Sequence, residues 1–208
     1  MELAGRLIWE WLVEAYDSFW NLVVFNVLWA LLTVLIIPAV PAAAGLYYAT
    51  NELAHQHPVN WRTFFEGIRA HFWLGWRWGL MNLAVLIVLA VNFRFYGRLP
   101  AGWAGWAQGF VLGLAGLWGL LQIYSFPLLL EQTDRRLLIA LRNSVVLLVR
   151  RPGLTLGLIL FLAALIALST LLLPPVWLFL TASLSAFLTN RSTIYLIENS
   201  AGQPSGEG

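Results

Sequence analysis

A run of twenty consecutive residues, 154–173, contains no charged side chain. An α-helix rises about 1.5 Å per residue, so twenty residues cover about 30 Å, which is the hydrocarbon thickness of a bilayer. Backbone N–H and C=O groups in lipid must be paired within the protein, and a single segment achieves this only as a helix. The sequence therefore predicts an integral membrane protein.

Four further apolar runs are separated by segments that carry most of the charge. Together they predict five transmembrane helices, at about residues 19–37, 76–92, 103–130, 154–173 and 176–197. The chain is 60% hydrophobic and 11% charged, whereas a soluble domain carries about 25% charged residues. With 208 residues, the chain is expected to form one all-α membrane bundle over 1–199. The small polar tail, 200–208, is expected to be disordered.

The arginines predict the orientation in the membrane. All twelve basic residues are arginine, and with five spans only Arg6, Arg94 and Arg98 fall on one side. The other nine fall on the opposite side, which the positive-inside rule identifies as cytoplasmic. We therefore expect a multi-pass protein of the cell membrane, with the N-terminus outside and the C-terminus in the cytoplasm.

Two cytoplasmic segments have the pattern of amphipathic helices that lie on the membrane. In residues 60–72, Asn60 is a candidate N-cap, and aromatic residues share one face. Residues 133–151 end in an arginine pair followed by Pro-Gly, which is typical of a helix C-terminus. Two interpretations of these segments stay open. They are ordinary connectors, or they form a docking surface for a partner protein or for anionic lipid head groups. The candidate surface residues are Arg62, Arg69, Arg135, Arg136, Arg142, Arg150 and Arg151.

Five glycines in the third predicted span recur at intervals of three and four residues, which keeps them on one helix face. They are Gly102, Gly105, Gly109, Gly113 and Gly116. Small residues let membrane helices approach closely. We expect this stripe to pack against another helix of the same chain, with the small residues of the last span as a partner. A homodimer seam is the alternative.

Neutral polar residues are few within the predicted spans. The candidates for an intramembrane polar site are Asn21, Asn26, Asn82, Gln108 and Gln122. Such residues either mark a ligand path or hydrogen-bond across helices. Arg191 is the deepest charge, and its long stem is expected to reach the head groups.

No catalytic, nucleotide-binding or metal-binding motif is present. The chain has no cysteine, and its net charge of +2 is too small to indicate a nucleic-acid partner. Glu52, His55, His57 and His71 lie near one another in sequence but with spacing that is poor for a metal site. We therefore expect neither an enzyme nor a bound cofactor.

Three segments of the chain have a distinctive pattern. The first is the proline-rich turn and the aromatic pair after the first span, the second is the aromatic and basic segment 64–72, and the third is the end of the third span with the connector that follows it. The residues that carry the turns are Pro38, Pro41, Tyr47, Tyr48 and Pro127. In these segments the chain resembles the YesL family of small bacterial membrane proteins, whose molecular activity is not established.

The resemblance implies an accessory role in carbohydrate uptake, because members of that family often lie beside carbohydrate-uptake genes. The first hypothesis is therefore an accessory or regulatory partner of a transport system. Transporter subunits or a membrane signalling protein would be its partners, besides the lipid bilayer. The alternative is a small-molecule or lipid carrier with a site between the helices.

Overall fold

The computed structural model describes residues 2–171 and 174–201, and every described segment of regular structure is helical. The all-α prediction is thus confirmed for this part of the chain, while most of the predicted tail lies outside it. The elements are α1 (Glu2–Asp17), α2 (Phe19–Val34), α3 (Ala39–Ala54), α4 (Trp61–Gly97), α5 (Ala104–Glu131), α6 (Leu137–Arg150), α7 (Pro152–Leu171), α8 (Pro174–Val176), the π-helix η1 (Trp177–Thr181) and α9 (Ala182–Ala201).

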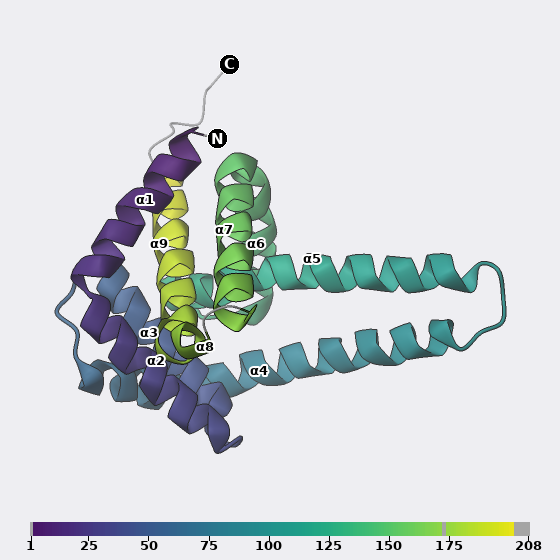
Figure 1. Cartoon of the computed structure of the whole chain (residues 1–208), viewed down its shortest axis with the longest axis horizontal. Coiled ribbons are helices and arrows are strands. Elements are labelled where there is room, and N and C mark those ends of the chain that lie inside the picture. Colours follow the sequence, from purple (N-terminus) through teal and green to yellow (C-terminus); the bar gives the residue numbers. More distant parts are fainter. Residues whose placement is uncertain (1, 172–173, 202–208) are drawn as a thin grey trace.

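The helices form a body and a projecting arm. Figure 1 shows α4 and α5 side by side as a long hairpin whose far end extends beyond the other helices. Helices α6, α7 and α9 run across the direction of this hairpin (Figure 1). In the most apolar stretch of α4, only 11% of the residues are buried inside the molecule. The hairpin is therefore exposed along most of its length.

Three helices, α4, α5 and α7, are long and apolar enough to cross a membrane. A fourth crossing is available if α1 and α2, which meet at 82°, act as one broken span. A helical membrane bundle is thus supported, but the five predicted spans are not confirmed. The last predicted span corresponds to α8, η1 and α9, and α9 carries an unbroken polar run at 189–193. That run lowers its hydropathy.

The first helix and the last described helix lie together, while the predicted orientation in the membrane stays a prediction. Helix α1 runs antiparallel to α9, because Trp11 contacts Tyr195 while Glu14 contacts Arg191. The first turn of α1 is therefore level with the last turn of α9 (Figure 1). Five crossings would have placed these two turns on opposite sides of the membrane. The structure instead groups them with the α6–α7 junction, where Ala4 packs on Gly157.

Helix α4 joins two elements that the sequence analysis kept apart. The amphipathic segment 60–72 and the span 76–92 form one helix, which breaks only at His71 (φ −118°, ψ 17°). Asn60 caps this helix as expected: its side chain accepts a hydrogen bond from the Arg62 N–H, and its own N–H donates to Thr63 Oγ1. The break lets the amphipathic part follow the body while the apolar part projects.

Helix α3 was not predicted as a helix. The turn at Pro38 begins it, and Pro41 sits in its first turn, where a missing N–H costs little. Small residues then bring α3 against α4. A Cβ atom at Gly45 would lie 2.8 Å from the backbone oxygen of Phe64, and one at Gly67 would lie 2.8 Å from Tyr48 Cβ. The two backbones are thus as close as glycine permits.

Gly67→Ala tests whether this close approach stabilises the fold. Alanine favours a helix over glycine by about 0.5–1 kcal/mol, but here its methyl group overlaps Tyr48. We expect a net loss of about 1–3 kcal/mol, typical of overpacking, read as a lower melting temperature in detergent. Gly113→Ala is the matched control, because a Cβ there meets nothing within 4 Å. Equal melting of both variants would contradict the packing argument.

Single cysteines test the arrangement of the ends, since the native chain has none. A cysteine in place of Leu3 and another in place of Asp134 are expected to label from the same side of the membrane. A cysteine in place of Leu99, at the hairpin tip, is expected to label from the other side. Labelling of the Leu3 and Asp134 positions from opposite sides would favour the five-span topology instead.

Candidate functional site

The glycine stripe on α5 has no partner helix within the described chain. A Cβ atom at Gly102, Gly105, Gly109, Gly113 or Gly116 would meet nothing within 4 Å. The expectation that the stripe packs inside the bundle is therefore wrong. The reason is rotational: α5 turns Gln108 and Trp118 toward α4, and at about 100° per residue the glycines point roughly the opposite way. The homodimer alternative is not tested.

The small residues of the last predicted span have a different role from the one expected. Ala186 is buried against α2 and α3, in a cluster with Phe25, Ala42 and Leu46. Thr189 donates to the Ala186 carbonyl of its own helix, and Ser185 donates to the Thr181 carbonyl of η1. Helix α9 thus lies within the body, and the exposed part of α5 lies beyond its reach (Figure 1).

Polar side chains hold the two helices of the hairpin together. Trp118 Nε1 donates to Asn82 Oδ1 at 3.0 Å, and Trp78 Nε1 donates to Gln122 Oε1 at 3.1 Å. Nearer the tip, Gln108 Nε2 donates to the Phe93 carbonyl at 3.3 Å. Three of the five predicted polar residues therefore form a ladder between α4 and α5. They stabilise the hairpin and do not converge on one ligand site.

The other two predicted polar residues lie in α2, away from this ladder. Asn21 is half-buried. Asn26 is fully buried and connects a backbone group of η1 with one in the first turn of α9. Its amide nitrogen donates to the Leu178 carbonyl at 2.5 Å, and its amide oxygen accepts from the Ser183 N–H at 2.8 Å. A π-helical turn leaves backbone groups without their regular partners, and Asn26 satisfies two of them.

A polar seam between α3 and α9 escaped the sequence analysis. Asn190 is fully buried, and its amide nitrogen donates to the Tyr47 carbonyl and to Thr50 Oγ1, both at 2.9 Å. On another face of α9, Ser192 lies 3.4 Å from the Tyr124 hydroxyl, which also contacts Thr155 at 3.1 Å. The run of five polar residues at 189–193 could have predicted this seam from the sequence.

Arg191 does not extend toward head groups as expected. Its guanidinium makes two hydrogen bonds to Glu14, Nε to Oε2 at 2.9 Å and a second nitrogen to Oε1 at 3.0 Å. Both side chains are mostly shielded, with 22% and 32% exposed. This two-point geometry fixes α1 against α9.

Two of the three histidines that were considered for a metal site contact a carboxylate, and the third, His71, contacts the Gly67 carbonyl. His55 Nε2 lies 3.0 Å from Glu131 Oε1, and His57 Nδ1 lies 2.8 Å from Glu52 Oε2. Asn51 also donates to Glu131 at 2.7 Å. Within the described residues, no group of three metal-ligating side chains comes together. These contacts join the end of α3 to the end of α5.

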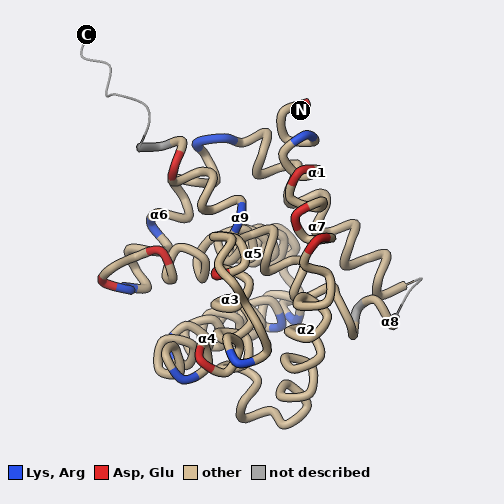
Figure 2. Tube along the Cα trace, turned by 90° about the vertical axis from the view of Figure 1, so that its left-hand side faces the viewer, with Lys and Arg blue, Asp and Glu red and all other residues tan. Residues whose placement is uncertain are grey.

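The arginine surface is divided into separate groups. Figure 2 shows basic residues on α4, near the start of α6, and at the α6–α7 junction. Arg62 lies over the Trp61 ring at 5.3 Å, and Arg136 contacts Asp134 at 3.7 Å. Arg69, Arg135, Arg142 and Arg150 are exposed, whereas Arg151 is half-buried. The seven residues therefore do not form one continuous patch.

The three family-like segments meet around two neighbouring tyrosines. The Tyr47 ring packs on Phe126 at 5.1 Å, next to the buried Pro127. The Tyr48 ring packs on His71 at 5.0 Å and covers Gly67. Burial and then the charge of Glu52 raise the pKa of Tyr48, so its hydroxyl stays protonated. Segments far apart in the sequence thus form one packing unit.

Residues 22–93 match a family model described as a protein of unknown function, DUF624. The match covers α3 together with most of α2 and α4. No curated protein and no solved structure matches the chain. The chain is thus similar over this stretch to an uncharacterised family, and the narrower assignment to YesL proteins stays a prediction.

Glu14→Gln tests the two-point ion pair. Removing the negative charge leaves the shielded Arg191 guanidinium without its counter-charge, so we expect a loss of about 1–2 kcal/mol in unfolding free energy. Thermal melting in detergent measures this. The exchange variant Glu14→Arg with Arg191→Glu should recover part of the loss. If Glu14→Gln melts like the native protein, the pair does not stabilise the body.

Proposed function

We propose that this chain is a non-catalytic accessory protein of a membrane transport system, and that the hairpin of α4 and α5 is its docking element. The observation that carries the proposal is the open glycine stripe on α5. Membrane helices associate through faces of small residues, because such faces let the backbones approach closely. In this chain the stripe is free for a helix of another protein.

The hairpin has the internal stability that a docking element needs. Two hydrogen bonds join its helices, from Trp118 to Asn82 and from Trp78 to Gln122. An apolar partner can cover the outer face without breaking either bond. Large exposed side chains flank the stripe, with Trp106, 85% exposed, on one side and Leu112, 57% exposed, on the other. They could pack on both sides of a helix seated on the glycines.

Four of the five polar residues that suggested a carrier have structural partners. The hairpin amides bind tryptophans and a carbonyl, and Asn26 binds the backbone around η1. These contacts within the described chain already occupy the amides, so the substrate-carrier hypothesis has less support than the docking hypothesis. The resemblance to YesL proteins extends the docking proposal to carbohydrate uptake.

Substitution at the centre of the stripe tests the docking proposal. A photo-reactive residue placed at Leu112, beside the stripe, is expected to cross-link the full chain to a polytopic subunit of a transport system in native membranes. Gly109→Leu and Gly113→Leu should each reduce this cross-link strongly without lowering the melting temperature, because a Cβ at either position meets no atom of the same chain.

Gly119→Leu is the matched control, because this glycine is equally open but is rotated away from the stripe. It should preserve the cross-link. A second copy of the chain as the cross-linked species, or lipid alone, would contradict the proposal. Unchanged carbohydrate uptake after deletion of the gene would contradict its transport part.

A further inference from the structure

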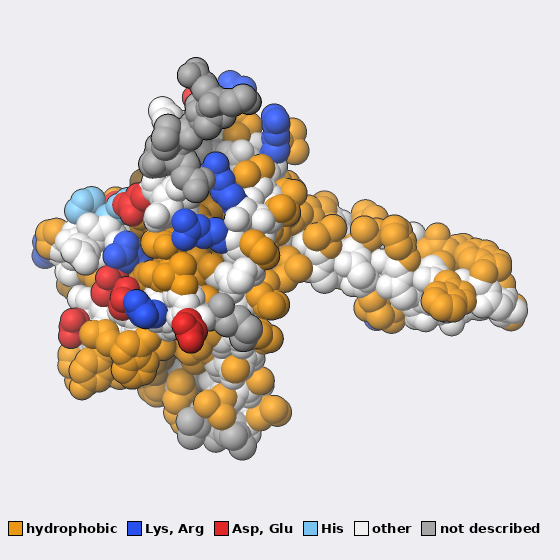
Figure 3. Space-filling view, turned by 90° about the horizontal axis from the view of Figure 1, so that it is seen from above, with side chains coloured by type: hydrophobic (Ala, Val, Ile, Leu, Met, Phe, Trp, Pro, Cys, Tyr) orange, Lys and Arg blue, Asp and Glu red, His pale blue; other side chains and the backbone are white. Residues whose placement is uncertain are grey.

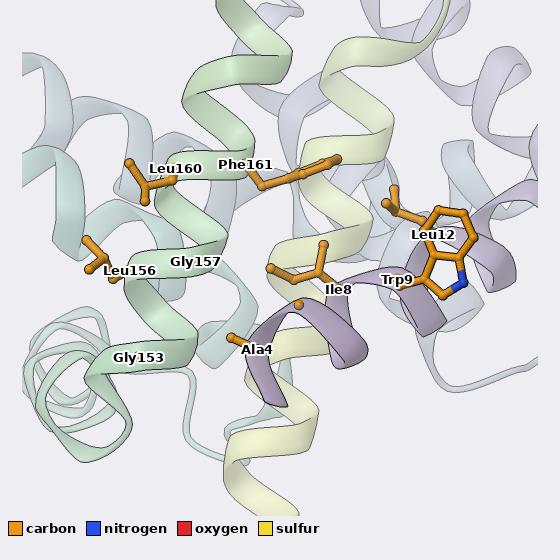
Figure 4. A pocket seen from close by; sticks show the side chains of 10 residues that line it. Ala4, Ile8, Trp9, Leu12, Gly153, Leu156, Gly157, Leu160 and Phe161 are labelled. Carbon is orange, nitrogen blue, oxygen red and sulfur yellow. The ribbon is translucent and has the colours of Figure 1, made fainter. Parts of the chain in front are cut away.

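An apolar groove of about 430 Å³ lies between α1 and α7. We propose that it holds one acyl chain of an anionic membrane phospholipid, whose phosphate contacts Arg6 and Arg150. Figure 4 shows the two helices and the side chains that line the groove between them. The main apolar contacts come from Ala4, Ile8 and Leu12 of α1 and from Leu156, Leu160 and Phe161 of α7.

The groove has a closed floor and an open end. At the floor, Gly157 lies against α1, since a Cβ there would be 3.3 Å from Ala4 Cβ and 3.6 Å from Ile8. At the open end, Gly5 and Gly153 line the groove, and a Cβ at either would meet nothing within 4 Å. The two helices thus touch along the bottom of the groove, and the groove stays open beside Gly5 and Gly153.

The length of the groove matches one leaflet. Its lining residues span positions 4–12 of α1 and 153–161 of α7, which is about 12 Å along each helix. Half of the hydrocarbon core is about 15 Å. An acyl chain that enters beside the first turn of α7 would therefore be covered by the groove over most of its length.

The charges at the open end favour an anionic head group. Arg150 and Arg151 immediately precede α7, and Arg6 follows Gly5 in α1. Figure 2 shows the basic residues of the α6–α7 junction and of α1 at the same end of the molecule. Arg151 is engaged, because it donates to the Tyr195 hydroxyl at 3.0 Å and lies over that ring.

Arg6 and Arg150 are exposed, and in the described part of the chain neither has a carboxylate within ion-pair distance. Guanidinium groups bind phosphate oxygens with two parallel hydrogen bonds. A phosphate at the interface would satisfy both arginines while its acyl chain follows the groove. Trp9, 68% exposed, lies on the same stretch of α1 and suits the interface.

Native mass spectrometry of the full chain in detergent tests the charge selection. We expect one phosphatidylglycerol to remain bound at concentrations where phosphatidylcholine does not. Arg6→Gln and Arg150→Gln should each weaken phosphatidylglycerol binding about fivefold, the contribution of one arginine near an anionic membrane, and leave phosphatidylcholine unchanged. Equal retention of the two lipids by the native chain would overturn the charge argument.

Gly153→Leu tests the groove itself. Its side chain enters open space, so it should displace about two methylene groups and weaken lipid binding about tenfold, with no loss of melting temperature. Gly113→Leu, an equally open glycine on α5, should bind lipid normally. Gly5→Leu replaces Gly153→Leu if the latter does not fold. Lipid binding that survives both substitutions, or a bound species with the mass of a second copy, would overturn the proposal.

Discussion

The close backbone contact between α3 and α4 positions most of the molecule. At Gly45 and Gly67 the two helices approach within the distance that a methyl group would occupy, so neither helix can move independently of the other. Helix α3 also packs against α2, α9 and the base of α5. It therefore acts as the central element of the body, although it is neither long nor especially apolar.

Polar and apolar contacts are divided between the two parts of the structure. The body contains buried polar residues that join helices distant in sequence, such as Asn190 with Thr50 and Arg191 with Glu14. The projecting hairpin is mostly apolar outside (Figure 3), and Asn82 and Gln122 bind tryptophans between its two helices. Helix α9 could not face lipid along its polar run without leaving those groups unpaired, and the surrounding helices supply their partners instead.

Local features were predictable from the sequence. The Asn60 cap and the apolar lengths of α5 and α7 depend on neighbouring residues alone, and they were identified closely. The direction of the glycine stripe on α5 could not be predicted, because it depends on which face of α5 meets α4. The ion pair between Arg191 and Glu14 joins residues 177 positions apart. No local sequence pattern predicts a pair at that separation. The start of α3 was interpreted as a loop, because a proline at the start of a helix and a proline in a loop give the same local sequence pattern.

The bridge from Asn26 to the backbone around η1 has a consequence for the order of assembly during synthesis. The two sides of this bridge are separated by 152 and 157 residues. Helices α4 and α5 make their contacts with each other and could insert as soon as both have left the ribosome. The body has to wait, because α2 and α3 meet η1 and α9 only when the end of the chain has been made. Asn26 connects α2 to this last segment, and Asn190 of α9 donates to Thr50 of α3. Release from the insertion machinery before α9 arrives would therefore leave the core of the body incomplete.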